Sequence, residues 1–255
     1  MPYSLKEINE AIRTDPKGFA EECDAGFAKK VENAARQIAE HRRESHVILL
    51  SGPSGSGKTT TALKIEEALE RIGISTHTIS MDNYFNTIDP ETAPRNREGA
   101  IDYESPFCLD IELLNRHFSM LDRGETIHVP KYEFARQMRS DILSQPLKLG
   151  PDELAIFEGI HALNDVIVGK NPKAFKLYIS PYKENADLMF DSSLPDEVAV
   201  LKPFVVPLLE ALPQGKYEIA DDILRGFERI EIMEESNIAP SSLVREFIGG
   251  SIYPS

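Results

Sequence analysis

Residues 52–59 read Gly52-Pro53-Ser54-Gly55-Ser56-Gly57-Lys58-Thr59 and are the most informative segment for the fold class. It matches the pattern G-x-x-x-x-G-K-[ST], whose glycines let the backbone curl so that several N–H groups point at one phosphate. The apolar run at residues 46–51 predicts a buried strand before it, and the apolar spacing of residues 62–72 predicts a helix after it. This context favours a nucleotide-binding α/β protein over the alternative, an ordinary Gly/Ser turn in front of a helix.

Two side chains of the loop have predicted roles in nucleotide binding. Lys58 is expected to reach the β- and γ-phosphates of ATP, and the Thr59 hydroxyl to ligate Mg²⁺. The positive end of the helix that begins near Lys58 favours the same anion. The predicted ATP-binding residues are Gly52, Pro53, Ser54, Gly55, Ser56, Gly57, Lys58, Thr59 and Thr60.

Further strands and helices extend the fold outward from the loop. Strands are predicted at residues 74–80, 127–129, 132–134, 154–157, 175–179 and 188–190, and a helix at 109–121. Such alternation favours an α/β fold with a mainly parallel sheet and helices on both faces. We expect a helical N-terminal extension at residues 1–45, a phosphate-loop core at 46–214 and a helical C-terminal tail at 215–255.

The composition limits the class of partner. The chain has 255 residues and is 41% hydrophobic, enough for one substantial core. Its 42 acidic and 28 basic residues give a net charge of −14, which opposes non-specific binding to nucleic acid or anionic membranes. The two cysteines have no metal or disulfide spacing and the first residues have no apolar signal segment, so a cytoplasmic setting is expected. A small-molecule substrate fits best, and a homo-oligomer is left open.

Two carboxylates follow predicted strands. Asp82 comes directly after the strand at 74–80, and Glu158 ends the strand at 154–157, so both are expected at the sheet edge that carries the loop. Asp82 can accept the proton of an attacking hydroxyl. Asp82 and the phosphate-binding Lys58 are therefore the predicted catalytic residues. Glu158 can place a carboxylate beside the magnesium ion. The alternatives are a turn-capping Asp82 and a solvent-facing Glu158.

Several segments carry a resemblance to a known family. The chain contains, in this order, Ser80-Met81-Asp82-Asn83-Tyr84-Phe85, Ile101-Asp102-Tyr103-Glu104-Ser105-Pro106, Pro130-Lys131-Tyr132-Glu133-Phe134 and Phe157-Glu158-Gly159-Ile160. Together with the loop, they resemble the uridine kinase family of P-loop nucleoside kinases, related to phosphoribulokinase and pantothenate kinase. The resemblance spans residues 47–179 and resumes at 181–187. It implies transfer of the ATP γ-phosphate to the 5′-hydroxyl of a ribonucleoside, most simply uridine or cytidine.

The resemblance also implies a nucleoside site. Asp82 would act as the base, Asp102 would hold the ribose hydroxyls, and Tyr132 and Phe134 would flank the nucleobase, with Tyr84 assigned to the same site. A carboxylate can accept two sugar hydroxyl bonds, and an aromatic face can pack on a flat pyrimidine. Without the resemblance, Asp102 is equally well a solvated loop acid, and Tyr132 and Phe134 are ordinary residues of one strand face.

Two departures from the family stand out. Where the family has a His that contacts the pyrimidine edge and an Arg two residues on, this chain has Gln137 and Arg139. The Gln amide can pair with uracil or cytosine but suits other acceptors too, and Arg139 is either a substrate or phosphate ligand or a surface residue. The family's arginine-rich lid is missing where Ser180 meets Pro181. Either the protein lacks a lid or a segment is missing from this sequence, and the good matches on both sides favour the second.

Two other functions stay open. One is a sister kinase for another small alcohol, such as a sugar phosphate or pantothenate. The other is a catalytically impaired regulatory module that only binds nucleotide, which the missing lid supports. The presence of Lys58, Thr59, Asp82 and Glu158 argues against the module, because a pure binder does not need a placed base.

Overall fold

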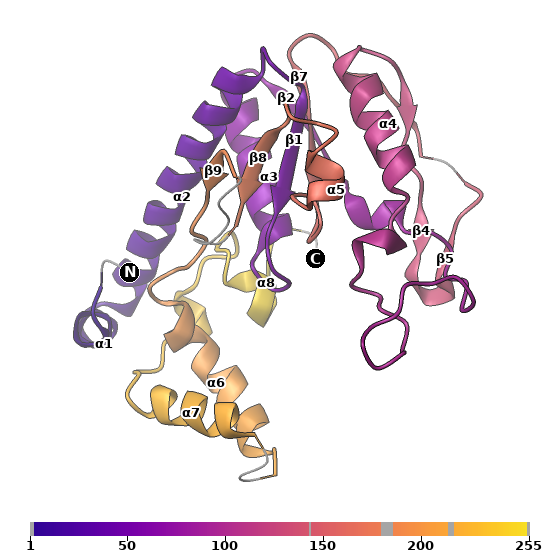
Figure 1. Cartoon of the computed structure of the whole chain (residues 1–255). Coiled ribbons are helices and arrows are strands. Elements are labelled where there is room, and N and C mark those ends of the chain that lie inside the picture. Colours follow the sequence, from indigo (N-terminus) through magenta and orange to yellow (C-terminus); the bar gives the residue numbers. More distant parts are fainter. Residues whose placement is uncertain (1–2, 143, 180–185, 214–216, 254–255) are drawn as a thin grey trace. The chain divides into compact units, whose positions relative to one another are not determined.

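The main β-sheet is built from parallel strands. The computed structural model describes residues 3–142, 144–179, 186–213 and 217–253. Its five-stranded sheet has the order β2-β7-β1-β8-β9, and each neighbouring pair is parallel (Figure 1). The strands are β1 (Val47–Ser51), β2 (Ser75–Ser80), β7 (Glu153–Glu158), β8 (Phe175–Tyr178) and β9 (Leu188–Met189). The predicted α/β class with a mainly parallel sheet is confirmed.

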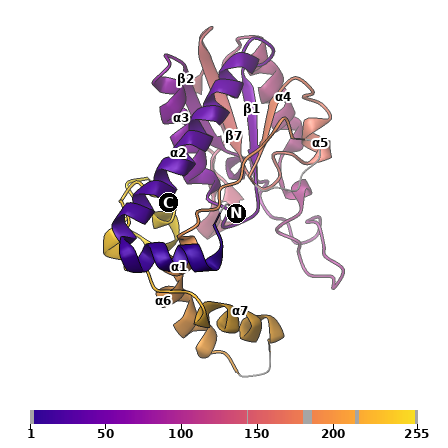
Figure 2. The same ribbon diagram turned by 90° about the vertical axis from the view of Figure 1, so that its left-hand side faces the viewer.

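Helices cover both faces of this sheet. α3 (Lys58–Glu70) packs on β1, β2 and β7, whereas α4 (Ile111–Asp122) and the short α5 (Asp165–Val168) pack on the opposite face. Both views show α3 and α4 on opposite sides of the strands (Figures 1 and 2). Because side chains alternate along a strand, Val47 and Leu49 face α4 while their sequence neighbours face α3. A strand buried on both faces explains the unbroken apolar run at 47–50.

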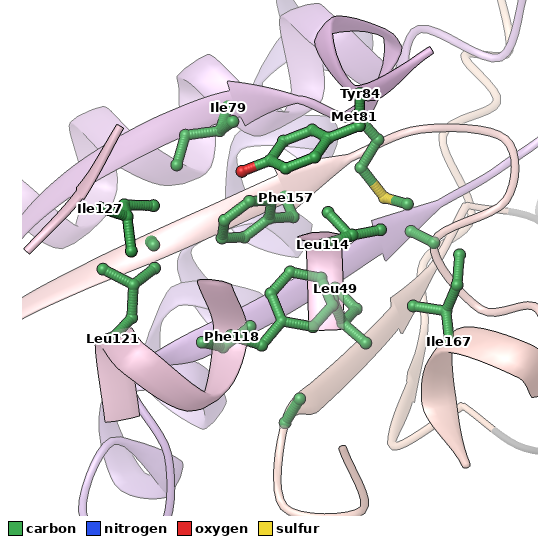
Figure 3. Packing of buried hydrophobic residues seen from close by; sticks show 14 of the residues in the cluster. Leu49, Ile79, Met81, Tyr84, Leu114, Phe118, Leu121, Ile127, Phe157 and Ile167 are labelled. Atoms are coloured by element: carbon green, nitrogen blue, oxygen red, sulfur yellow. The ribbon is translucent and has the colours of Figure 1, made fainter. Parts of the chain in front are cut away.

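Aromatic and aliphatic side chains fill the space between the sheet and α4 (Figure 3). The ring of Phe118 on α4 meets that of Phe157 on β7 edge-on, with centroids 4.6 Å apart. Leu49, Leu114 and Tyr84 are fully buried in the same cluster. Each such side chain contributes about 1.5–3 kcal/mol on burial, so this cluster fixes β1 and β7, the strands that lead into the candidate site.

Two short antiparallel ribbons lie outside the main sheet. β3 (Ile127–His128) pairs with β6 (Pro146–Leu147), and β4 (Tyr132–Glu133) pairs with β5 (Met138–Arg139). Strand propensity at 127–134 therefore predicted strands correctly, but their partners come from residues that carried no strand pattern of their own.

The chain divides into two compact units. The sheet unit comprises residues 31–191, and the helical unit comprises residues 1–30 and 192–255. The helical unit contains α1 (Leu5–Thr14), the first part of α2 (Pro16–His41), α6 (Glu197–Glu210), α7 (Glu218–Glu228) and α8 (Arg245–Ile248). None of the helices in the described residues combines the length and apolar character needed to span a bilayer. The boundaries expected at residues 45 and 214 stay a prediction.

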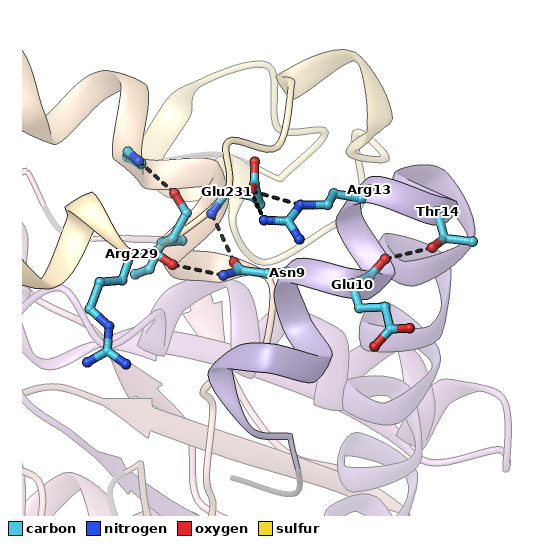
Figure 4. Close-up of polar contacts among 8 residues, drawn as sticks. Asn9, Glu10, Arg13, Thr14, Arg229 and Glu231 are labelled. Carbon is cyan, nitrogen blue, oxygen red and sulfur yellow. Dashed lines mark hydrogen bonds and ion pairs between the residues drawn. The ribbon is translucent and has the colours of Figure 1, made fainter.

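Within the helical unit, hydrogen bonds join α1 to a segment more than 200 residues away in sequence (Figure 4). The Asn9 amide donates to the Arg229 carbonyl at 2.8 Å and accepts from the Glu231 backbone N–H at 2.9 Å. Arg13 forms an ion pair with Glu231. The start of the chain and its C-terminal region therefore share one folded unit.

Candidate functional site

The phosphate loop begins after β1 and ends at α3. Gly55 (φ 68°) and Gly57 (φ 74°) adopt the left-handed conformation, which glycine reaches without steric cost. Gly57 is the residue directly before α3, so the unpaired N–H groups of the first helical turn point back to the loop. These N–H groups and the helix dipole create a site for an anion.

The start of the loop is packed too tightly for any side chain at Gly52. A Cβ atom added there would lie 2.8 Å from Ser56 Oγ and 2.9 Å from the Cβ of Ile179, which follows β8. Ser56 Oγ is itself buried and has no hydrogen-bond partner among the described residues. A phosphate oxygen would supply the acceptor that this buried hydroxyl lacks, so the loop fits its predicted ligand.

Lys58 is half-buried at the first position of α3. Its Nζ donates a hydrogen bond to the Pro53 carbonyl at 2.8 Å, which folds the lysine across the loop. Thr59 is half-buried and Thr60 is buried in the same helical turn. The structure thus brings the predicted ATP-binding residues together in one short segment, as their sequence continuity requires.

The two predicted carboxylates lie at neighbouring strand ends. Glu158 is the last residue of β7, pairs in register with Leu50 on one side and Ser80 on the other, and is only 8% exposed. Asp82 follows β2 and reaches solvent. Desolvation by the surrounding protein nevertheless raises the pKa of Asp82, while the charges of Lys58 and His161 oppose that rise. Lys58, Asp82 and His161 therefore lie close enough to interact.

Mg²⁺ is implied by the motif, and oxygen donors are present to hold it. Mg²⁺ keeps several waters and takes only one or two protein oxygens together with substrate phosphate. The Thr59 hydroxyl and the nearly buried Glu158 carboxylate suit such a site. No group of three or more His, Cys, Asp or Glu side chains in the described part of the chain is arranged as a metal cage.

Asp102 lies in a loop beside this edge. Its N–H donates to the Pro94 carbonyl at 2.8 Å, and its Oδ1 accepts from the Glu104 N–H at 3.1 Å. Its charge acts on His161, as does that of Asp82. The structure therefore gathers Asp82, Asp102 and His161. His161 was missed from the sequence, although it directly follows the segment Phe157-Glu158-Gly159-Ile160.

Three aromatic rings form a cluster next to the β4–β5 ribbon. The ring centroids of Tyr132 lie 5.0 Å from Phe134 and 5.5 Å from Phe85, and those of Phe85 and Phe134 are 6.2 Å apart. Tyr132 is buried, whereas Phe134 is 61% exposed. Gln137, at the turn of this ribbon, is exposed and has a left-handed backbone (φ 51°). The exposed face of Phe134 is thus an apolar surface that a ligand ring can cover.

Tyr84 is not among the residues gathered at the site. It is fully buried, and its hydroxyl hydrogen-bonds to His117 Nδ1 at 2.9 Å. Burial lowers the pKa of His117 to about 4, so this pair is a neutral part of the core. The Asp82 segment is a short 3-10 helix (Met81–Tyr84) that points Tyr84 inward, a direction that the sequence pattern does not define.

Arg139 makes contacts that hold the β4–β5 ribbon in place. Its Nη1 pairs with Asp110 Oδ2 at 2.9 Å, and its Nη2 donates to the Tyr84 carbonyl at 3.1 Å. Asp110 also caps α4 by accepting from the Leu113 N–H. Arg139 thus links the ribbon to α4 and to the segment that bears Asp82. The junction of Ser180 and Pro181, where the lid is missing, lies outside the described residues.

Comparison with known proteins assigns the segment that carries these residues to a protein family. Residues 47–170 match the model of the Phosphoribulokinase / Uridine kinase family. This segment belongs to that family. The family resemblance predicted from the motifs is thereby confirmed, and the match includes the loop, Asp82, Asp102, Tyr132 and Glu158.

Individual relatives match over a similar length. A uridine kinase of Halobacterium salinarum is 32% identical over 124 residues, which cover 49% of this chain and 52% of that protein. A uridine kinase of Macrococcus caseolyticus is 34% identical over 119 residues, which cover 47% of this chain and 54% of that protein. The chain spans about half the length of the curated relatives it matches. A solved structure titled as a possible uridine kinase from Bacillus stearothermophilus shares 21% identity with a TM-score of 0.45, covering 57% of this chain and 88% of that one.

Proposed function

We propose that the protein transfers the γ-phosphate of ATP to the 5′-hydroxyl of a ribonucleoside, most simply uridine or cytidine. One observation carries the proposal: the phosphate loop shares a sheet edge with Asp82, and Asp102 lies near enough to that edge for its charge to act on the same histidine. An anion site beside a base and a second carboxylate suits transfer of a phosphoryl group to a polyhydroxyl acceptor. The matched uridine kinases support the nucleoside as that acceptor.

The residues divide the chemistry between them. The loop N–H groups and Lys58 hold the β- and γ-phosphates, and Mg²⁺, when bound, neutralises charge on their oxygens. Asp82 accepts the proton of the acceptor hydroxyl while the oxygen bonds to phosphorus and ADP departs. Desolvation raises the pKa of Asp82, which makes this carboxylate a stronger base. Asp102 accepts hydrogen bonds from the ribose, and Phe134 offers its exposed face to the nucleobase.

An acceptor screen tests this function. Coupled ADP release is measured with uridine, cytidine, adenosine, guanosine, pantothenate and a pentose phosphate, and radiolabelled product is separated by thin-layer chromatography. We expect turnover with uridine or cytidine. Turnover with pantothenate or the sugar phosphate alone would establish a sister kinase, and ATP binding without any transfer would establish the regulatory module; either result contradicts the proposal.

A further inference from the structure

His161 lies in the turn that follows β7. Two hydrogen bonds hold this turn against the strand that leads into the phosphate loop. The Gly159 N–H donates to the Leu50 carbonyl at 3.0 Å, and the Ser51 hydroxyl donates to the Ile160 carbonyl at 3.0 Å. The position of His161 is therefore set by β1, the strand at the centre of the site.

The same turn packs against the segment that bears Asp82. β2 and β7 are parallel, with Ser80 opposite Glu158. A Cβ atom added to Gly159 would lie 3.0 Å from the Cβ of Met81, so the two chain segments approach this closely only because Gly159 has no side chain. His161 and Asp82 thus emerge from adjacent strand ends that are in direct contact.

The His161 ring has one hydrogen bond and one nitrogen without a partner. The ring bonds to the backbone carbonyl of Glu104, whereas Nε2 is buried and has no partner among the described residues. Since Nε2 has no partner in the described part of the chain, we assign the N–H that the carbonyl requires to Nδ1. Burial lowers the pKa of His161 in spite of that bond and of the charges of Asp82, Glu104 and Asp102, so the ring is neutral at pH 7. A neutral ring with its proton on Nδ1 has a lone pair on Nε2, and only a donor can satisfy it.

The surrounding groups point to the kind of ligand that brings such a donor. The carboxylate oxygens of Asp82 and Asp102, whose charges act on the ring, are hydrogen-bond acceptors as well. Three acceptors gathered at one edge suit a partner with several O–H groups. A buried polar atom without a partner is costly, so the site is completed by a ligand rather than by its own side chains.

We propose that His161 binds the acceptor substrate, with Nε2 accepting a hydrogen bond from one hydroxyl of a polyol such as ribose. This rests on the kinase function proposed above and adds to its acceptor site a residue that the motifs do not contain. Nε2 is shielded from water before the acceptor binds. Hydrogen bonds of this kind commonly tighten only in the complex.

Three variants test the role of the ring. His161→Leu should raise the KM for uridine by about 10- to 100-fold and leave the KM for ATP within about twofold. His161→Gln, whose side-chain carbonyl can place an acceptor near the position of Nε2, should restore most of the loss. His128→Leu, at an exposed position on β3, is the matched control and should leave both constants unchanged. Circular dichroism checks that each variant is folded.

Deoxynucleosides separate substrate binding from a structural role. The KM values of wild type and His161→Leu are compared for uridine, 2′-deoxyuridine and 3′-deoxyuridine. The variant should lose affinity for uridine but not for the analogue that lacks the hydroxyl bound by Nε2. An equal loss for all three nucleosides, or no loss for any, overturns the assignment of His161 while leaving the nucleoside kinase function standing.

The same measurements distinguish failure of the proposed kinase function from failure of the role assigned to His161. If wild type phosphorylates another polyol but no nucleoside, the nucleoside function falls, and His161 is tested with deoxy analogues of that polyol. If wild type neither binds nor phosphorylates any alcohol of the screen, both proposals are overturned.

Discussion

Both units of the chain bury polar atoms that have no partner among the described residues, but the surroundings of these atoms differ. In the sheet unit, Ser56 Oγ and His161 Nε2 lie at strand ends, beside loop N–H groups and charged side chains. In the helical unit, Asp196 Oδ1 is enclosed directly before α6, next to the thiol of Cys23. The first arrangement suits a ligand, whereas the second is internal to the fold. We therefore expect changes in the sheet unit to alter turnover and changes in the helical unit to alter stability.

The largest effect should come from Asp82, because its carboxylate is placed to take the proton of the acceptor. Asp82→Asn should lower kcat by about 10²- to 10⁴-fold, since an amide cannot act as a general base. Affinity for ATP, measured by calorimetry, should stay the same because the phosphate loop is intact. Unchanged turnover would remove Asp82 from the reaction and leave the sheet unit without its proposed base.

A smaller effect is expected where the backbone of the loop is packed most closely. Gly52→Ala would bring its Cβ to 2.9 Å from the Cβ of Ile179 and 2.8 Å from Ser56 Oγ. The loop must shift to relieve this overlap, so stability should fall by about 1–3 kcal/mol and ATP should bind more weakly. Thermal unfolding and ATP titration measure the two consequences.

A matched substitution in the helical unit serves as the control. Gly26 lies inside α2, and a Cβ atom there meets nothing within 4 Å. Gly26→Ala should therefore stabilise the helix by about 0.5–1 kcal/mol and leave ATP affinity unchanged. Equal effects of the two alanines on ATP binding would contradict the division between the units.

Much of the phosphate side could be predicted because its determinants are adjacent in sequence. β1, the loop and α3 form one continuous segment, and Asp82 and Glu158 follow from the rule that parallel strands end at the same edge. His161 and the pair of Arg139 with Asp110 were not predictable, because they depend on which distant segments pack together. The inward direction of Tyr84 depends on a 3-10 turn, and the link between Asn9 and Arg229 spans 220 residues. No periodicity within one segment encodes such contacts.

Asp196 gives the clearest signature of the helical unit, because its predicted effect depends on pH. Burial raises the pKa of Asp196 to about 7, and the charges of Asp24 and Glu197 add to the rise, while hydrogen bonds with its own backbone and with Cys23 oppose it. The folded protein therefore holds a proton on Asp196 that the unfolded chain releases near pH 4. Linkage then requires that the contribution of Asp196 to stability is greatest below about pH 4 and declines as the pH rises toward 7.

Asp196→Asn removes this decline because an amide does not ionise. At pH 8 the variant should be more stable than wild type by about 1–3 kcal/mol, and at pH 4 the two should be nearly equal. Hydrogen exchange of the α6 amides, compared between variant and wild type at each pH, measures the effect within the helical unit. Glu228→Gln, at an exposed position on α7, controls for the loss of one negative charge and should not reproduce it. A gain for Asp196→Asn of the same size at both pH values would mean that Asp196 is ionised throughout, and a loss of turnover would mean that the helical unit contributes to the reaction.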